Sequence, residues 1–169
     1  MKLDIACGQN KPKGFKGVDI APGEGVDFVW DLENFPWTPF KDESVSEVNV
    51  SHYVEHTKDL LKFMDEVWRI CEDGAKVTIV SPYYTSIRAW QDPTHTRAIS
   101  EATFMYFQKK WREDNKLNHY PVKCDFEVTN MVIFFNSPWD KKTEEARQFA
   151  AQHYFNAVSD ILVELKAKK

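Results

Sequence analysis

The sequence lacks several features that would place it in a specialised class of protein. Its 169 residues carry 22 Lys and Arg against 26 Asp and Glu, which gives a net charge of −4. Without an excess of positive charge, there is no electrostatic reason to expect a nucleic-acid partner. The apolar runs are far too short to cross a bilayer, and Asp4 falls inside what would be the apolar part of a signal peptide.

Cysteines are also scarce. The three present, Cys7, Cys71 and Cys124, are odd in number and widely spaced, so they predict neither a disulfide framework nor a zinc ribbon. They are typical of reduced thiols in a cytoplasmic protein. There is no internal repeat, no low-complexity stretch and no second domain. The composition therefore predicts one globular domain over residues 1–169, of undetermined oligomeric state.

What the chain does contain is an alternation of short apolar runs and amphipathic segments. Apolar residues recur at helical spacing from Leu60 to Cys71, which predicts a helix that begins near Asp59 and has Gly74 as its C-cap. Runs bounded by Gly, Pro or Asp predict strands. These expected strands cover residues 3–6, 17–20, 26–30, 45–51 and 75–81.

The second half continues the alternation. A helix is expected from near Ser100, with the core residues Phe104 and Phe107 and also Trp111 on one side, and another over residues 144–155. Strands are expected over residues 126–135 and at the C-terminus, where residues 161–167 alternate with period two. The order predicts a mainly parallel seven-stranded α/β sheet with helices on both faces and one antiparallel strand near the C-terminus.

Small and acidic residues follow the first two expected strands. The first strand ends in Ala6, Cys7 and Gly8, where small side chains let a ligand approach the backbone closely, and the second carries Asp19. In nucleotide-binding α/β folds, an acidic residue at the end of the second strand accepts hydrogen bonds from ribose hydroxyls. Each feature alone also fits an ordinary turn, so the prediction depends on their occurring together at strand ends.

The string Leu3-Asp-Ile-Ala-Cys-Gly8, followed by Gly14-Phe-Lys-Gly-Val-Asp-Ile20, resembles the opening of class I S-adenosylmethionine-dependent methyltransferases. More specifically, it resembles the small bacterial and phage proteins of the type-11 group. The resemblance covers residues 3 to about 107 and implies a Rossmann-like domain that uses S-adenosylmethionine as its cofactor. Further similar segments occur in the same order at residues 30–37, 51–56, 66–70, 92–97 and 103–104.

The resemblance assigns roles to residues at matching positions. The turn from Ala6 to Gly8 would line the methionine end of the cofactor, and Asp19 would hold the ribose. The adenine would lie by Asp31, and the transferable methyl by Ser51 and His52. The implied cofactor-binding set is Ala6, Cys7, Gly8, Asp19, Ile20, Asp31, Leu32, Ser51 and His52.

Two departures from the family pattern affect this part of the chain. Ala6 stands where the family usually has glycine. In addition, only residues 9–16 separate the first two strands, whereas a parallel crossover normally needs a dozen or more residues. We therefore expect the first crossover helix to be missing or reduced to a turn, and cofactor affinity to be modest.

The loop after the fifth strand offers catalytic candidates. His95 could serve as a general base, and Asp92 and Arg97 could orient it or bind the acceptor. Tyr83, Tyr84 and Trp90 could wall the acceptor pocket. A turn that merely closes onto the sheet would explain Asp92-Pro-Thr-His95 equally well. The sequence does not identify the acceptor: a small molecule, a sugar, a lipid precursor and a protein all remain open, and the acidic balance argues against nucleic acid. Of these we expect a small molecule.

Two alternatives remain open. His52-Tyr-Val-Glu55-His56 fits the inverted zinc-protease pattern, in which two His on a helix share a metal and the Glu acts as base of a metallohydrolase. However, the motif directly follows an apparent strand and the methyltransferase resemblance explains the same letters, so we assign no metal ligand. The chain's small size also fits a non-catalytic S-adenosylmethionine-binding module or subunit.

Overall fold

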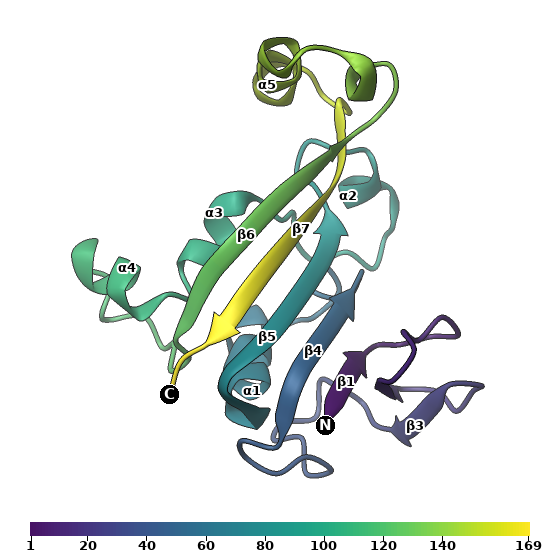
Figure 1. Cartoon of the computed structure of the whole chain (residues 1–169), viewed down its shortest axis with the longest axis vertical. Coiled ribbons are helices and arrows are strands. Elements are labelled where there is room, and N and C mark those ends of the chain that lie inside the picture. Colours follow the sequence, from purple (N-terminus) through teal and green to yellow (C-terminus); the bar gives the residue numbers. More distant parts are fainter.

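A computed structural model describes all 169 residues, which form one seven-stranded sheet in the order β3-β2-β1-β4-β5-β7-β6 (Figure 1). The first five strands pair in parallel, and β7 is antiparallel to both of its neighbours. This confirms the predicted mainly parallel sheet with one antiparallel strand. The strands are β1 (Lys2–Ile5), β2 (Lys16–Asp19), β3 (Val26–Val29), β4 (Val45–Ser51), β5 (Cys71–Pro82), β6 (Phe126–Phe135) and β7 (Val158–Ala167).

The helices are short, and none is long and apolar enough to cross a membrane. The longest helix begins where predicted, because the Asp59 side chain accepts a hydrogen bond from the Lys62 amide at 3.0 Å. The helical elements are α1 (Leu60–Ile70), α2 (Arg88–Gln91), α3 (Glu101–Met105), α4 (Lys109–Asp114), the 3-10 turn η1 (Trp139–Lys141) and α5 (Glu144–His153).

Two details of the helix predictions are wrong. Gly74 does not cap α1, because the helix ends at Ile70 and the chain enters β5 at Cys71 with extended backbone. Gly74 instead has a φ of +78° and lies where the pairing of β4 with β5 shifts register, a bulge that suits glycine. The helix expected from Ser100 is divided into α3 and α4, although Phe104 and Phe107 are buried in the core as expected.

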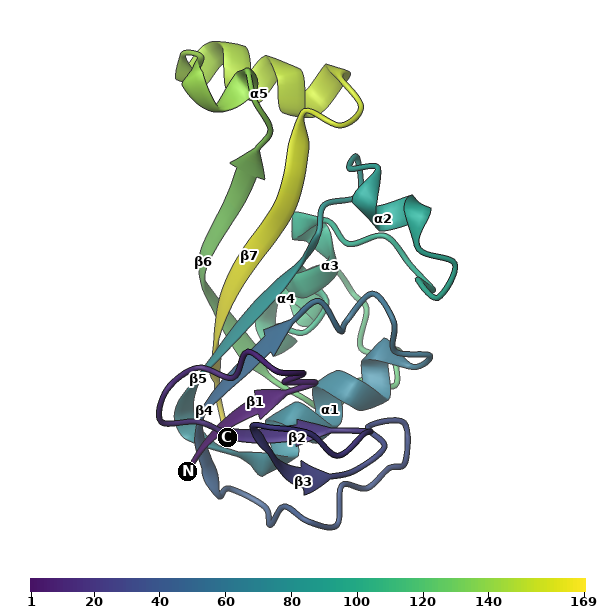
Figure 2. The same ribbon diagram turned by 90° about the vertical axis from the view of Figure 1, so that its right-hand side faces the viewer.

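The expectation of helices on both faces of the sheet is also wrong. Figure 2 shows α1, α3 and α4 on the same face, while the opposite face carries no helix. The connections from β1 to β2 and from β2 to β3 contain no helix, because each is too short to form a crossover layer. The absence of the first crossover helix agrees with the sequence prediction. The fold therefore has two layers, and the sheet buries one side only.

The open face of the sheet is polar, as expected for strands that face water on one side. Along β7, Ile161, Val163 and Leu165 are buried, whereas the alternating Glu164 and Lys166 are not. Pairs of charged or polar side chains join neighbouring strands across this face. They are Lys2–Glu47, Lys76–Glu164 and Asn49–Asp4, each at 2.5–2.6 Å.

The loop that replaces the first crossover helix is held to β3 by one carboxylate. Asp27 accepts hydrogen bonds from the ammonium groups of Lys11 and Lys16 and from the Gly17 amide. The hydrogen bonds from Lys11, then Lys16, then the Gly17 amide lower the pKa of Asp27 well below its ordinary value of 3.8.

Replacing Asp27 by Asn should make stability less dependent on pH. A depressed native pKa means that the ionised carboxylate stabilises the fold above the unfolded pKa, and that this contribution is lost as pH falls through the native pKa. We expect Asp27→Asn to unfold at lower urea concentration than the wild type at pH 7, with the difference narrowing below about pH 4. The exposed Asp140→Asn serves as control, and a difference that widens in acid would contradict the assignment.

Gly17 lies where β2 packs against the turn after β1. A Cβ atom at this position would lie 2.5 Å from the Cys7 sulfur and 2.5 Å from the Gly25 carbonyl oxygen. Gly17→Ala should therefore lower the free energy of unfolding by about 1–3 kcal/mol, the usual cost of overpacking. A Cβ at Gly23 comes no closer than 3.8 Å to any neighbour, so Gly23→Ala should change stability by less than about 1 kcal/mol. If Gly17→Ala and Gly23→Ala had equal urea midpoints, the prediction would be contradicted, because Cys7 and Gly25 would then move aside for the new Cβ at little cost.

Candidate functional site

A cavity of about 340 Å³ opens at the carboxyl ends of β1 and β2, where ligands bind in open α/β sheets. The structure brings five of the nine sequence-predicted cofactor residues together around it. These are Ala6, Asp19, Ile20, Asp31 and Leu32. They come from three segments of the chain, namely the turn after β1, the end of β2 and the segment that follows β3.

The turn after β1 and the end of β2 are joined by a direct hydrogen bond. The Gly8 amide donates to Asp19 Oδ2 at 2.9 Å, and the Ala21 amide lies 3.4 Å from Asp19 Oδ1. A carboxylate has about four acceptor positions, so Asp19 retains capacity for further donors from a ligand. The Gly8 turn and the Asp19 carboxylate, which the sequence predicts as parts of one site, therefore lie side by side.

Two non-glycine residues at this edge of the sheet adopt left-handed backbone. Ala6 follows β1 with a φ of +53°, and His52 follows β4 with a φ of +55°. An L-residue pays a conformational cost in this region, and such residues cluster at functional sites. The glycine that resembling sequences carry at position 6 would adopt this backbone without strain.

Four further residues line this cavity and were not predicted to bind the cofactor: Glu33, Tyr53, His56 and Lys58. The Tyr53 hydroxyl donates to Glu33 Oε1 at 3.2 Å, and the Lys58 amide approaches the same carboxylate at 3.2 Å. Burial, followed by the charge of Glu33, raises the pKa of Tyr53, so its phenol stays neutral. Tyr53 and His56 lie inside the 51–56 motif, but nothing in the sequence shows that this turn folds back over the cavity.

Four predicted cofactor residues do not line the cavity, and one of them, His52, lines the second cavity described below. Gly8 contributes only its backbone amide, and Ser51 ends β4 with an exposed side chain. The Cys7 side chain is buried beneath the turn, close to Gly17. Burial is the main cause that raises the pKa of the Cys7 thiol, which is therefore a packing group rather than a nucleophile.

A second cavity, of about 210 Å³, adjoins the first. It contains the predicted catalytic residues His95 and Asp92, together with His52 and Glu55. The turn after β4 and the loop after β5 both contribute to it. His56 lines both cavities, so one imidazole forms a common wall between them.

The hydrogen bonds in the second cavity differ from the predicted ones. The Asp92 carboxylate makes no hydrogen bond to the His95 ring, although the Asp92 carbonyl accepts from the His95 amide at 3.2 Å. Asp92 Oδ1 instead accepts from the Thr94 amide at 2.8 Å and from the Thr94 hydroxyl at 2.7 Å. These bonds lower the pKa of Asp92. Thr94 Oγ1 in turn lies 2.9 Å from His56 Nδ1, so Asp92 orients His56 through Thr94. His95 Nδ1 is bonded to the Ala89 carbonyl at 3.1 Å.

Arg97 holds the turn after β4 and does not contact His95. Its guanidinium donates to the carbonyl oxygens of Val54, Thr57 and Lys58. The predicted aromatic wall is likewise absent from the second cavity. Tyr83 and Tyr84 line a separate hollow in which the Tyr83 hydroxyl donates to Glu101. Trp90 is 62% exposed, and its indole donates to the Tyr84 carbonyl.

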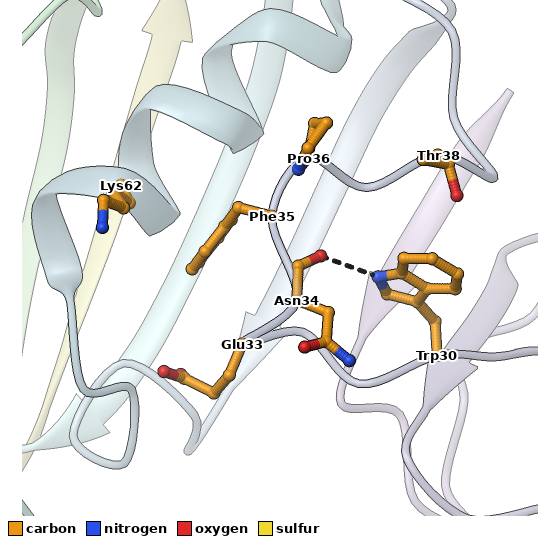
Figure 3. A pocket seen from close by; sticks show the side chains of 7 residues that line it. All are labelled: Trp30, Glu33, Asn34, Phe35, Pro36, Thr38 and Lys62. Carbon is orange, nitrogen blue, oxygen red and sulfur yellow. Dashed lines mark hydrogen bonds between the residues drawn. The ribbon is translucent and has the colours of Figure 1, made fainter.

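The largest hollow, of about 620 Å³, lies beside the loop after β3 (Figure 3). Figure 3 shows the Trp30 indole donating across the loop to the Asn34 carbonyl, at 3.3 Å. Of its lining residues only Glu33 also borders the first cavity, and none comes from the carboxyl ends of β1 or β2. We therefore place the functional site at the two smaller cavities.

The helix that the inverted zinc-protease pattern requires is not formed. Residues 54–56 form a turn, and α1 begins only at Leu60. His52 and His56 therefore do not share a helix face. The structure groups Glu55 and His56 with His95 instead.

No family model matches the chain, and comparison with curated proteins gives no match. Solved structures do match it in fold. An S-adenosylmethionine-dependent methyltransferase of Archaeoglobus fulgidus shares 19% identity over 98% of this chain and 85% of its own, with a TM-score of 0.61. An S-adenosylmethionine-dependent methyltransferase of Mesorhizobium loti shares 11% identity over 98% of this chain and 89% of its own, with a TM-score of 0.57.

A third match is geranyl diphosphate C-methyltransferase of Streptomyces coelicolor, whose crystal contains Mg²⁺, geranyl diphosphate and S-adenosylhomocysteine. It shares 11% identity over 98% of this chain and 72% of its own, with a TM-score of 0.58. At these identities the comparisons establish the fold. The chain thus has the Rossmann-like fold of these methyltransferases.

Arg97→Lys should loosen the turn after β4, because an ammonium group cannot donate to three spread carbonyl oxygens at once. We expect the free energy of unfolding to fall by about 1.5–3 kcal/mol, the range for hydrogen bonds to a charged group. Hydrogen exchange should accelerate at the amides of residues 56, 57 and 96, which bond within these loops, while β6 and β7 keep their protection. Unchanged exchange at those three amides would refute the positioning role of Arg97.

Proposed function

We propose that this chain transfers the methyl group of S-adenosylmethionine to a small-molecule acceptor, with the cofactor in the first cavity and the acceptor in the second. The observation that carries the proposal is the 2.9 Å bond between the Gly8 amide and the Asp19 carboxylate beside an open cavity. This hydrogen bond lies at the edge of a sheet whose fold matches that of S-adenosylmethionine-dependent methyltransferases. On the resemblance at residues 3–107, we further propose that the chain belongs to the small bacterial and phage type-11 group and acts in the cytoplasm.

The residues of the first cavity fit the parts of this cofactor. Asp19 retains acceptor positions for the ribose hydroxyls, and Asp31, which accepts the Glu33 amide at 3.0 Å through Oδ1, retains Oδ2 for the adenine amino group. Ile20 is 66% exposed, so it leaves apolar surface that a flat base would cover. The small turn from Ala6 to Gly8 leaves room for the methionine end.

When bound, S-adenosylmethionine supplies an electrophilic methyl group for in-line displacement. The chain's own residues have to align the acceptor and remove its proton. His95 is suited to the second task, because the Ala89 carbonyl can hold the proton on Nδ1 and leave Nε2 free to accept another. His56 separates the two cavities and limits how the cofactor and acceptor can approach one another.

Calorimetry with S-adenosylmethionine and S-adenosylhomocysteine tests the cofactor site. Asp19→Ala should lose about 1–3 kcal/mol of binding free energy, because buried donors of the ribose are left without an acceptor. Asp19→Asn retains one carbonyl oxygen for the Gly8 amide, so it isolates the contribution of the second oxygen. Asp140→Asn is the distant control. If both Asp19 variants bound the cofactor as tightly as the wild type, the proposed cofactor site would be contradicted. If the wild type did not bind the cofactor, the proposed function would be contradicted.

Transfer from methyl-labelled cofactor into separate small-molecule, protein and nucleic-acid fractions tests the reaction. We expect label in the small-molecule fraction, and less of it with His95→Ala at unchanged cofactor affinity. Cofactor binding without transfer to any fraction would instead support the non-catalytic binding module.

A further inference from the structure

We infer that Glu55, His56 and His95 form a binding site for one divalent transition-metal ion. Each of the three offers one ligand atom, and these atoms lie within 4.8 Å of one another. Zinc–ligand bonds of about 2.0–2.2 Å place ligand atoms about 3.4 Å apart in a tetrahedral site, so small side-chain rotations would close the group around an ion. The donor set consists of one carboxylate and two imidazoles.

The Glu55 carboxylate is the independent observation that calls for a cation. The residue is 1% exposed, and neither of its carboxylate oxygens has a hydrogen-bond partner. Its nearest basic group is His52 Nδ1, at 3.4 Å from Oε1, which makes no hydrogen bond with it. A buried carboxylate without a hydrogen-bond partner is strongly unfavourable unless a cation compensates its charge, and this one lines the second cavity.

Hydrogen bonds prepare both imidazoles to act as ligands through Nε2. The Thr94 hydroxyl donates its only proton to Asp92, so Thr94 Oγ1 accepts from His56 Nδ1 at 2.9 Å. His95 Nδ1 likewise donates to the Ala89 carbonyl. In the neutral form of each ring, Nε2 is therefore the nitrogen that can bind an ion. Metal-binding histidines characteristically donate their other ring proton to such a partner, which fixes tautomer and orientation.

The two loops that supply the three ligands are tied together by the backbone. The Thr96 amide donates to the Glu55 carbonyl at 2.8 Å, and the Thr96 hydroxyl lies 3.1 Å from the same oxygen. The rings of His56 and His95 meet edge to face with centroids 4.6 Å apart. The group is thus assembled before any ion binds.

The donor set selects the class of ion. Two imidazoles and one carboxylate with open positions suit Zn²⁺, Fe²⁺, Co²⁺ or Mn²⁺. Mg²⁺ and Ca²⁺ prefer oxygen ligands throughout and should bind more weakly here.

The role of the ion rests on the proposed function. Because His56 borders both cavities, an ion on its Nε2 would lie near their junction, where a hydroxyl group of the acceptor could complete the coordination. The ion would lower the pKa of that hydroxyl, and its proton would pass to His52. The electron pair left on oxygen would form the bond to the methyl carbon, while the methyl–sulfur bond breaks and its electron pair stays on sulfur, releasing S-adenosylhomocysteine. With the ion bound, His95 is a ligand and His52 takes its place as the base, so the general-base role proposed above for His95 applies only to the metal-free chain. The preferred acceptor is then a hydroxylated small molecule.

The test titrates the chelator-treated wild-type chain with Co²⁺, followed by visible absorption, and with Zn²⁺ and Mg²⁺, followed by calorimetry. We expect one equivalent of Co²⁺ or Zn²⁺ to bind, and Mg²⁺ to bind at least tenfold more weakly. Glu55→Gln and His95→Ala should each weaken Zn²⁺ binding at least tenfold, whereas the exposed His119→Ala should not change it. Without metal, Glu55→Gln should unfold at a higher temperature than the wild type, because it removes a buried carboxylate that has no hydrogen-bond partner.

Three outcomes would overturn the metal site. The first is a wild type that fails to bind one equivalent of Co²⁺ or Zn²⁺ saturably. The second is that Glu55→Gln and His95→Ala bind Zn²⁺ as tightly as His119→Ala does, and the third is that metal-free Glu55→Gln unfolds at a lower temperature than the metal-free wild type. Calorimetry with S-adenosylmethionine on the same metal-free samples separates the two proposals, since neither Glu55 nor His95 lines the cofactor cavity. We expect both variants to bind the cofactor as the wild type does. Metal binding by a wild type that does not bind the cofactor would overturn the proposed function and leave the metal site standing.

Discussion

Three hydrogen bonds from the Arg97 guanidinium fix the turn after β4, and both cavities depend on the position of that turn. Tyr53 and His56 of the turn close the first cavity, and Glu55 and His56 border the second. Burial lowers the pKa of Arg97, yet a guanidinium remains charged at any ordinary pH, so the tie persists. Arg97, from the loop after β5, thereby fixes the position of the first cavity relative to the second, which the strands of the sheet alone would not do.

The sequence allowed the sheet to be predicted because its strands are short, apolar and separated by clear turn residues. The pairing of Gly8 with Asp19 was also predictable, since the carboxyl ends of adjacent parallel strands meet at one edge. The bare face of the sheet was not predicted, although two features of the sequence are consistent with it. Alternation along β7 and a first connection too short for a helix both point to strands covered on one side only.

Other parts of the site lay beyond sequence reasoning for a physical reason. Glu55 and His95 meet only because Thr96 bonds to the Glu55 backbone, a contact between two irregular loops that no periodicity encodes. Asp92 looked like a partner of His95, but its carboxylate is taken up by Thr94 two residues on, a local turn bond that competes with any longer-range contact. Tyr83 and Tyr84 follow β5, as does the loop that carries His95. However, their side chains line a hollow beside α3 and β6, so a position just after a strand did not predict which way a side chain points.

The helix-free face of the sheet also affects how the whole molecule responds to heat and denaturant. Strand residues on that side, such as Lys76 and Lys166, already contact water in the native state. Unfolding therefore exposes less new apolar surface than it would in a three-layered domain of equal length. The heat capacity of unfolding and the urea m-value both scale with that newly exposed area. A stability curve that is flatter with temperature than is usual for a chain of this size follows from a sheet with a single covered side.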